Sequence, residues 1–263
     1  MKNVFKHGIP IFELLDNFDT EDFTLDKLDL AFGYNDVDTN LVNFLKLDVM
    51  TDYLCNIDRS HSIEHIIDVA KNSLDLADRL NANKNVAITA AVYHELGRVY
   101  DSDPSNNHMI SYNAMMIDSS ILKGLCLSDS ECRDAGIAII ENSVYVTVKT
   151  SIYSKILTDA DLITSLLDTD YMIKRYLNYI LINFTYKSTS EMLDMAFDVI
   201  NKRYNIKENR SYISIDSLGT SIGKKIYKDN IDNILEICED KSKFIHRVEN
   251  LIIMENNKRK ARG

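Results

Sequence analysis

The chain has 263 residues, an apolar fraction of 45% and a formal net charge of −10. A general nucleic-acid binder needs a basic face, so this acidic balance argues against nucleic acid as a partner. No apolar run approaches the roughly 20 residues of a membrane span, and the cysteines show no paired spacing. We therefore expect reduced thiols, a cytoplasmic location and no membrane partner.

Proline and glycine, the residues that most often interrupt helices, number only two and eight. Long helices are therefore permitted almost everywhere, and we predict an all-α fold. The expected parts are an N-terminal helical extension (1–50), a core (51–170), a C-terminal helical part packed on the core (171–256) and a disordered tail (257–263). Either extension is a candidate lid or a surface for a homodimer.

The N-terminal part begins with short apolar-periodic pieces at 11–18 and 25–32, followed by a longer predicted helix over 40–56. The first strong helix is predicted over Ser62–Leu80, which has a clear apolar stripe. His61 and His65 stand four residues apart at its start, so both can point to one side. These histidines either join a site or are capping or solvent-facing residues.

A second helix, predicted over Val86–Val99, is nearly apolar all round and is therefore expected to be central. Near its end it carries His94 and Glu95. A charged residue in such a place is rarely fully buried unless it is paired or bound to a metal. Imidazole and carboxylate donors together suit Mn, Fe, Co, Ni or Zn. The alternative is a buried histidine that is paired with a neighbouring acid.

The downstream segments add further candidates. His108 opens a predicted helix over 109–122, where a helix N-terminus favours anions; a plain cap-region histidine is the alternative. Segment 144–148 alternates with period two and predicts a short strand or hairpin arm. The helix over 151–167 carries Asp159 and Asp161, and residues two apart do not share a helical face. We therefore expect only one of these aspartates to bind metal.

The C-terminal half is predicted to be helical. Capping boxes at Ser128–Glu131 and Ser188–Glu191 mark two helix starts. Helices are expected over 171–185 and 192–204, followed by two or three more as far as about residue 254. His246 lies in a charged helical stretch and is expected to be solvated.

The order of a histidine, a histidine–acid pair and an aspartate resembles the HD-domain superfamily of metal-dependent phosphohydrolases, over about residues 58–167. The closest branch reads D-x-x-H-x-x-x-H-x-x-x-V, A-x-x-H-D, H-x-x-x-S, A-I-x-x-H-S and D-A-D-x-L. The matching residues here are Asp58, His61, His65 and Val69; Ala91, His94 and Glu95; His108 and Tyr112; Ala138, Ile139, Asn142 and Ser143; and Asp159, Ala160 and Asp161.

This resemblance implies an HD-like helical bundle that binds a divalent ion, which would be Mn, Fe, Co, Ni, Zn or Mg. The implied metal ligands are His65, His94, Glu95 and Asp161. The implied substrate is a small phosphorylated molecule, with a nucleotide as the leading class. We expect His108 and Arg98 to act in catalysis, and His61 and Lys155 to bind the substrate.

Several positions depart from the family pattern. Glu95 replaces the aspartate of the HD pair, and its extra methylene shifts the oxygen by about 1.5 Å. Asn142 stands where the branch often has a histidine, and it is a poorer ligand for a transition metal. Ser62 and Leu162 stand where an acid and a basic residue are common. An alternative is therefore a degenerate HD-fold protein that binds a nucleotide or a protein partner without turnover. A di-iron oxygenase on the same scaffold is a third hypothesis.

Overall fold

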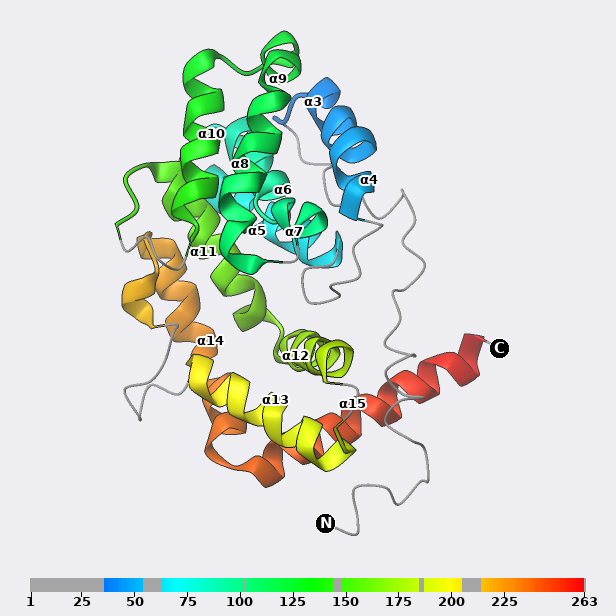
Figure 1. The fold of residues 1–263 in the computed structure, drawn as a ribbon. Coiled ribbons are helices and arrows are strands. Elements are labelled where there is room, and N and C mark those ends of the chain that lie inside the picture. Colours follow the sequence, from blue (N-terminus) through cyan, green and yellow to red (C-terminus); the bar gives the residue numbers. More distant parts are fainter. Residues whose placement is uncertain are drawn as a thin grey trace. The chain divides into compact units, whose positions relative to one another are not determined.

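The structure, a computed structural model, describes residues 36–53, 63–101, 103–143, 148–184, 187–204 and 214–262. Every regular element in these ranges is helical and none is a strand, which confirms the all-α class (Figure 1). The predictions for the pieces before residue 36 and for His61 lie outside the described residues, as do residues 144–147 of the strand predicted at 144–148.

The described residues form two compact units. The first unit contains those within 24–164 and 215–227, and the second contains those within 165–214 and 228–262. The boundaries predicted at residues 50 and 170 remain a prediction, as does the homodimer. In the described part, no helix has both the length and the hydropathy that crossing a membrane requires.

Helices of the first unit are short to medium in length. They are α3 (Thr39–Phe44), α4 (Met50–Tyr53), α5 (Ile63–Arg79), α6 (Lys84–Tyr93), α7 (Gly97–Tyr100), α8 (Asn107–Ile117), α9 (Ser119–Leu125), α10 (Asp129–Glu141) and most of α11 (Ile152–Leu167). A π-helical turn, Leu45–Val49, joins α3 to α4, and 3-10 turns span Pro104–Asn106 and Ile215–Ser217. The first turns of α14 (Ser221–Glu239) also belong to this unit.

Helix α6 is the centre of the first unit. All of its residues from Val86 to Tyr93 are buried, and it packs against α5, α8 and α10 (Figure 1). The hydroxyl of Tyr53 donates to the carbonyl of Val92 at 2.7 Å and so ties α4 to α6. The all-round apolar pattern of this segment correctly predicted a central helix.

The predicted helix over 86–99 is interrupted. Helix α6 ends at Tyr93, and α7 begins at Gly97. Between them the backbone forms tighter bonds, from Leu96 N to Tyr93 O and from Arg98 N to Glu95 O, each at 3.0 Å. Such i to i+3 bonds are typical of a helix end. His94 and Glu95 therefore lie in the break between the two helices.

Side chains from α8 replace the helical bonds that are lost at this break. The carbonyl of His94 accepts from Ser111 Oγ at 3.1 Å and from Asn107 Nδ2 at 3.3 Å. The amide of Gly97 donates to Ser111 Oγ at 2.8 Å. Helix α8 lies so close that a Cβ atom on Gly97 would be 2.2 Å from the carbonyl oxygen of Asn107. Glycine is therefore the residue that this contact accommodates.

Other predicted elements match with local differences. The capping box at Ser128–Glu131 is present, and Ser188 and Glu191 form the same reciprocal bonds. The predicted helix over 109–122 is divided at Asp118 into α8 and α9. Residues 257–262, expected to be disordered, continue helix α15 as far as Arg262. Lysine, arginine and alanine are good helix formers, which accounts for this difference.

The second unit contains α12 (Thr169–Asn183), α13 (Thr189–Tyr204), α15 (Lys241–Arg262) and the rest of α14. Helix α13 packs against α12 and α15. The rings of Phe197 and Phe244 meet with centroids 5.7 Å apart. Arg247 pairs with Asp170 at 2.6 Å, and burial raises the pKa of Tyr204 above its ordinary value. His246 is exposed, as predicted.

The close approach of α7 to α8 predicts a cost for any side chain at Gly97. We expect Gly97→Ala to lower the free energy of unfolding by about 1–3 kcal/mol, because the new Cβ must push the backbone of Asn107 away. Urea denaturation would measure the change. Gly124→Ala is the matched control, since a Cβ at that exposed helical position meets nothing within 4 Å. If both variants are equally stable, the approach does not constrain the fold.

Candidate metal centre

Helices α5 and α11 bring a histidine and an aspartate together. His65 lies in the first turn of α5 and is fully buried. Its Nε2 atom is 3.3 Å from Oδ1 of Asp161 on α11, whose side chain is 21% exposed. A hydrogen bond from Asn72 Nδ2 to Thr164 Oγ1, at 2.8 Å, joins the same two helices. The contact between His65 and Asp161 is thus supported by a second contact between α5 and α11.

His94 stands at the buried end of α6, fully shielded from solvent. Its Nδ1 atom is 2.6 Å from the carbonyl of Ala91. A carbonyl only accepts, so Nδ1 carries the proton and Nε2 offers its lone pair. Within the described residues, this buried Nε2 has no hydrogen-bond partner. The rings of His65 and His94 lie 5.6 Å apart, centroid to centroid, at an angle of 61°.

One ligand atom from each of His65, His94 and Asp161 lies within 4.8 Å of the others. Two imidazoles and one carboxylate form a donor set that suits zinc and other first-row divalent metals. A buried imidazole nitrogen without a partner is costly, and a bound cation would satisfy it. The residues present therefore fit a divalent metal ion. Three of the four predicted ligands are brought together here.

Asn142 contributes a polar contact at the edge of this group. It follows the last residue of α10 and is 8% exposed. Its Nδ2 atom lies 3.3 Å from Oδ2 of Asp161, while Oδ1 of the same carboxylate faces His65. The side chain that departs from the family pattern thus donates to a carboxylate of the group.

Asp159, two residues before Asp161, has different partners. Its Oδ1 accepts from the amide of Gly219 at 2.7 Å, and its Oδ2 accepts from Thr220 N at 2.9 Å and from Thr220 Oγ1 at 2.5 Å. A Cβ on Gly223 would lie 2.2 Å from Oδ2. Burial raises the pKa of Asp159, although these hydrogen bonds oppose the rise. This carboxylate therefore fixes the start of α14.

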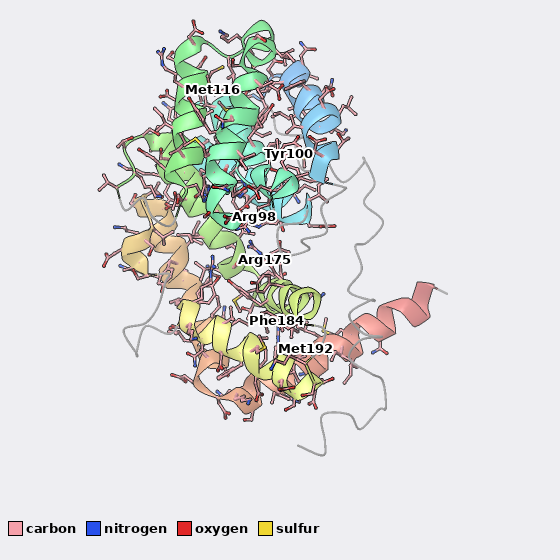
Figure 2. The ribbon with its side chains drawn as sticks, viewed as in Figure 1. Arg98, Tyr100, Met116, Arg175, Phe184 and Met192 are labelled. Atoms are coloured by element: carbon pink, nitrogen blue, oxygen red, sulfur yellow. The ribbon has the colours of Figure 1, made fainter. Side chains whose placement is uncertain are left out.

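Glu95 lies next to His94 but outside the group of ligand atoms. It is 5% exposed, and its Oε2 accepts from Asn107 Nδ2 at 2.9 Å and from Arg98 Nε. Arg98 belongs to the short helix α7 and is one of the side chains that Figure 2 labels. The Arg98 side chain is 24% exposed. Glu95 is thus held in a partly buried ion pair, and its role as a metal ligand remains a prediction.

His108 lies in the first turn of α8, close to the same residues. Burial lowers its pKa, the charges of Glu95 and Asp161 oppose this effect, and the charges of His94 and Arg98 add to it. Its Nδ1 atom is buried and makes no hydrogen bond to any described residue. The position accords with a histidine that is neutral near pH 7 and borders the group.

Lys155 is the predicted substrate-binding residue that the structure keeps apart from the group. It precedes Asp161 by six positions on α11, and residues with that spacing point about 120° apart on a helix. Its stem packs against Gly219, where an added Cβ would lie 2.6 Å from Lys155 Cγ. The other predicted substrate-binding residue, His61, is outside the described residues.

Three residues that support this centre have no signal in the sequence. Asn107 and Ser111 hold the end of α6, and Thr220 holds Asp159. Asparagine, serine and threonine are common at helix starts and on helix surfaces, so no spacing identifies them. Their partners lie on other elements, and the contacts emerge only from the packing.

The chain is similar to known proteins over the part that carries this centre. A family model described as the HD domain matches residues 62–166. The crystal structure of a predicted HD superfamily hydrolase from an uncultured Thermotogales bacterium is similar, with 17% sequence identity and a TM-score of 0.49. The similarity covers 76% of this chain and 88% of that one. No curated protein sequence matches the chain.

The arrangement of His65, His94 and Asp161 predicts binding of about one divalent ion per chain. We expect His94→Ala to weaken binding of Mn²⁺ or Co²⁺ by at least about tenfold, because a buried ligand is lost. Metal content after incubation and desalting would measure this. His246→Ala, at an exposed histidine of the second unit, is the control and should bind as the wild type does. Equal metal content in both variants would contradict the site.

The different surroundings of the two aspartates of α11 predict effects of different size on the free energy of unfolding when each is replaced by asparagine. Asp159→Asn should lower the free energy of unfolding by about 1–3 kcal/mol, because its new NH₂ group faces donors. Asp161→Asn should cost less than about 1 kcal/mol with a chelator present, since the side chain is partly exposed and its amide oxygen can still accept from Asn142. Urea unfolding of both variants makes the comparison. A cost at Asp161 as large as that at Asp159 would refute this division of roles.

Proposed function

We propose that this chain is a metal-dependent phosphohydrolase of the HD type, and the match of the HD-domain family model to residues 62–166 supports this. The observation that carries the proposal is the group formed by His65, His94 and Asp161, whose ligand atoms lie within 4.8 Å of one another. A divalent ion held there would supply a Lewis acid for the phosphoryl group and lower the pKa of the attacking water. The reaction adds water at phosphorus and breaks an ester or anhydride bond.

In this proposal the acidic residues of the centre orient and deprotonate the attacking water. Asp161 or Glu95 orients the attacking water and takes its proton. Asp161 is better exposed for this, because its side chain is 21% accessible while Glu95 is nearly covered. The leaving oxygen receives a proton from solvent or from a neighbouring acid, so that the proton count balances.

The basic residues around the centre have roles in binding the phosphate. His108 donates to a non-bridging oxygen through the N–H of its neutral ring. Arg98 compensates phosphate charge from the side of α7, and Lys155 and His61 are the predicted contacts farther out. The lowered pKa of His108 supports its neutral form, and the electrostatic effect of Arg98 on His108 supports their proximity.

The substrate class that we propose is a nucleotide. The support is the resemblance to the HD branch that includes nucleotide hydrolases, carried by motifs within residues 58–167. Cytoplasmic location and homodimerisation remain part of this proposal.

A second candidate is an HD-fold protein that binds a nucleotide without turnover. One observation favours it: Glu95, which replaces the aspartate of the HD pair, is bonded to Arg98 and Asn107. With one carboxylate fewer to coordinate the metal, such a site would still bind a nucleotide but would no longer hydrolyse it. Tight binding of a nucleotide with no product release would support this candidate.

A substrate screen tests the proposed activity. Purified protein loaded with Mn²⁺ or Co²⁺ should release phosphate or pyrophosphate from at least one nucleoside phosphate. His94→Ala should reduce the rate at least about 100-fold, because metal catalysis lowers the activation free energy by several kcal/mol. Product release would be measured colorimetrically, with pyrophosphatase added to reveal pyrophosphate.

Two controls test whether the measured activity depends on the metal and on the proposed site. A chelator should abolish the activity and added metal should restore it, whereas His246→Ala should have the wild-type rate. A rate that is the same in His94→Ala as in the wild type would assign the activity to a contaminant. Metal binding without any turnover would favour the binding protein.

A further inference from the structure

The two carboxylate oxygens of Asp161 face different neighbours. Oδ1 lies 3.3 Å from Nε2 of His65, and Oδ2 lies 3.3 Å from Nδ2 of Asn142. The NH₂ group of an asparagine only donates, so the second contact is a hydrogen bond from Asn142 to the carboxylate. This bond opposes rotation of the Asp161 carboxylate and keeps Oδ1 on the side of His65.

The backbone of Asn142 is fixed at the end of α10. Its amide nitrogen donates to the carbonyls of Ala138 and Ile139 at 3.0 and 3.3 Å, so the residue ends the helix in a regular conformation. The residue is 8% exposed. The side chain that reaches Asp161 therefore extends from a backbone that is already ordered and shielded from solvent.

Lys149 bonds the two residues that flank Asn142. Its Nζ atom donates to the carbonyl of Glu141 and, at 3.4 Å, to the carbonyl of Ser143. The carbonyls at the end of a helix lack partners within the helix, and a lysine near that end can satisfy them. The partly buried Lys149 thus holds the backbone on both sides of Asn142.

A second connection joins the end of α10 to the start of α11. Glu141 accepts from the amide of Thr150 through Oε2 at 2.8 Å, and from Thr150 Oγ1 through Oε1 at 2.6 Å. The next residue, Ser151, accepts from the amide of Ser154 at 3.0 Å in the first turn of α11. Asp161 lies on this same helix. The end of α10 is therefore tied to α11 near its first turn and again at Asp161.

We infer that Asn142 is a positioning residue of the candidate metal centre, which holds the Asp161 carboxylate so that Oδ1 faces the ion. Lys149 acts through Asn142 by fixing the backbone on either side of it. The inference rests on the proposed function, because it requires an ion at His65, His94 and Asp161. A neutral donor orders a carboxylate ligand before the ion arrives and adds no charge beside it.

The affinity for Co²⁺ and the absorption spectrum of bound Co²⁺ test the role of Asn142. Asn142→Ala removes the donor and should weaken Co²⁺ binding about tenfold, which is the scale of partners that orient metal ligands. At saturating Co²⁺ its d–d absorption spectrum should match that of the wild type, because the protein ligands are unchanged. Asp161→Ala lacks a ligand outright, so it should bind more weakly still and have a different spectrum.

Lys149→Met gives a second test in which two explanations differ in sign. Loss of the bonds to the end of α10 should weaken Co²⁺ binding several-fold, because Asn142 is then less ordered. Electrostatics alone would have the opposite effect, since removing a positive charge favours binding of a cation. Lys123→Met, at the exposed ion pair with Asp129, is the charge-matched control and should bind as the wild type does.

Urea unfolding of the metal-free variants separates positioning from a structural role. A lower free energy of unfolding with wild-type Co²⁺ affinity in Asn142→Ala would overturn the inference and leave the proposed function intact. A changed spectrum at saturation would also overturn it, since Asn142 would then be a ligand. If Asn142→Ala does not fold, unchanged or tighter binding in Lys149→Met rejects the positioning role. A wild type that binds no Co²⁺ removes both the inference and the proposed function.

Discussion

Helix α6 ends inside the protein, so the polar groups at this end must be satisfied without bulk water. An unpaired buried carbonyl or amide costs as much as a lost hydrogen bond, or more. Ser111 and Asn107 meet this demand by bonding the His94 carbonyl, and Ser111 also accepts from Gly97. These bonds require α8 to approach α7 closely, and the approach requires a glycine. The position of His94, and hence of the candidate metal ligands, follows from this constraint.

Much of the fold could be predicted because its signals are local. The stripe of α5, the apolar run of α6 and the capping box at Ser128 each predict an element from neighbouring residues. The group of His65, His94 and Asp161 was predictable as a set because histidines and acids in apolar helices are rare enough for their order to be informative. Glu95 was expected among the ligands on the same grounds; its Oε2 accepts from Asn107 and Arg98, and its role as a metal ligand remains a prediction.

What the sequence could not show depends on contacts between distant segments. The end of α6 is invisible in an unbroken apolar run, because the side chain that caps it comes from 13 residues later. The partners of Asp159 lie 60 and 61 residues farther along the chain. Two aspartates separated by one alanine thus have unrelated tasks, since a helix points them in different directions. One belongs to the metal group, and the other anchors a later helix.

The hydrogen bond from His94 Nδ1 to Ala91 fixes both the rotation of the ring and the place of its single proton. A flexible imidazole loses rotational entropy when it coordinates an ion, and a ring protonated at the coordinating nitrogen must also give up that proton. In His94 the bond to Ala91 already fixes the ring and leaves Nε2 without a proton. Folding therefore already provides part of the ordering that metal binding at the candidate centre would require.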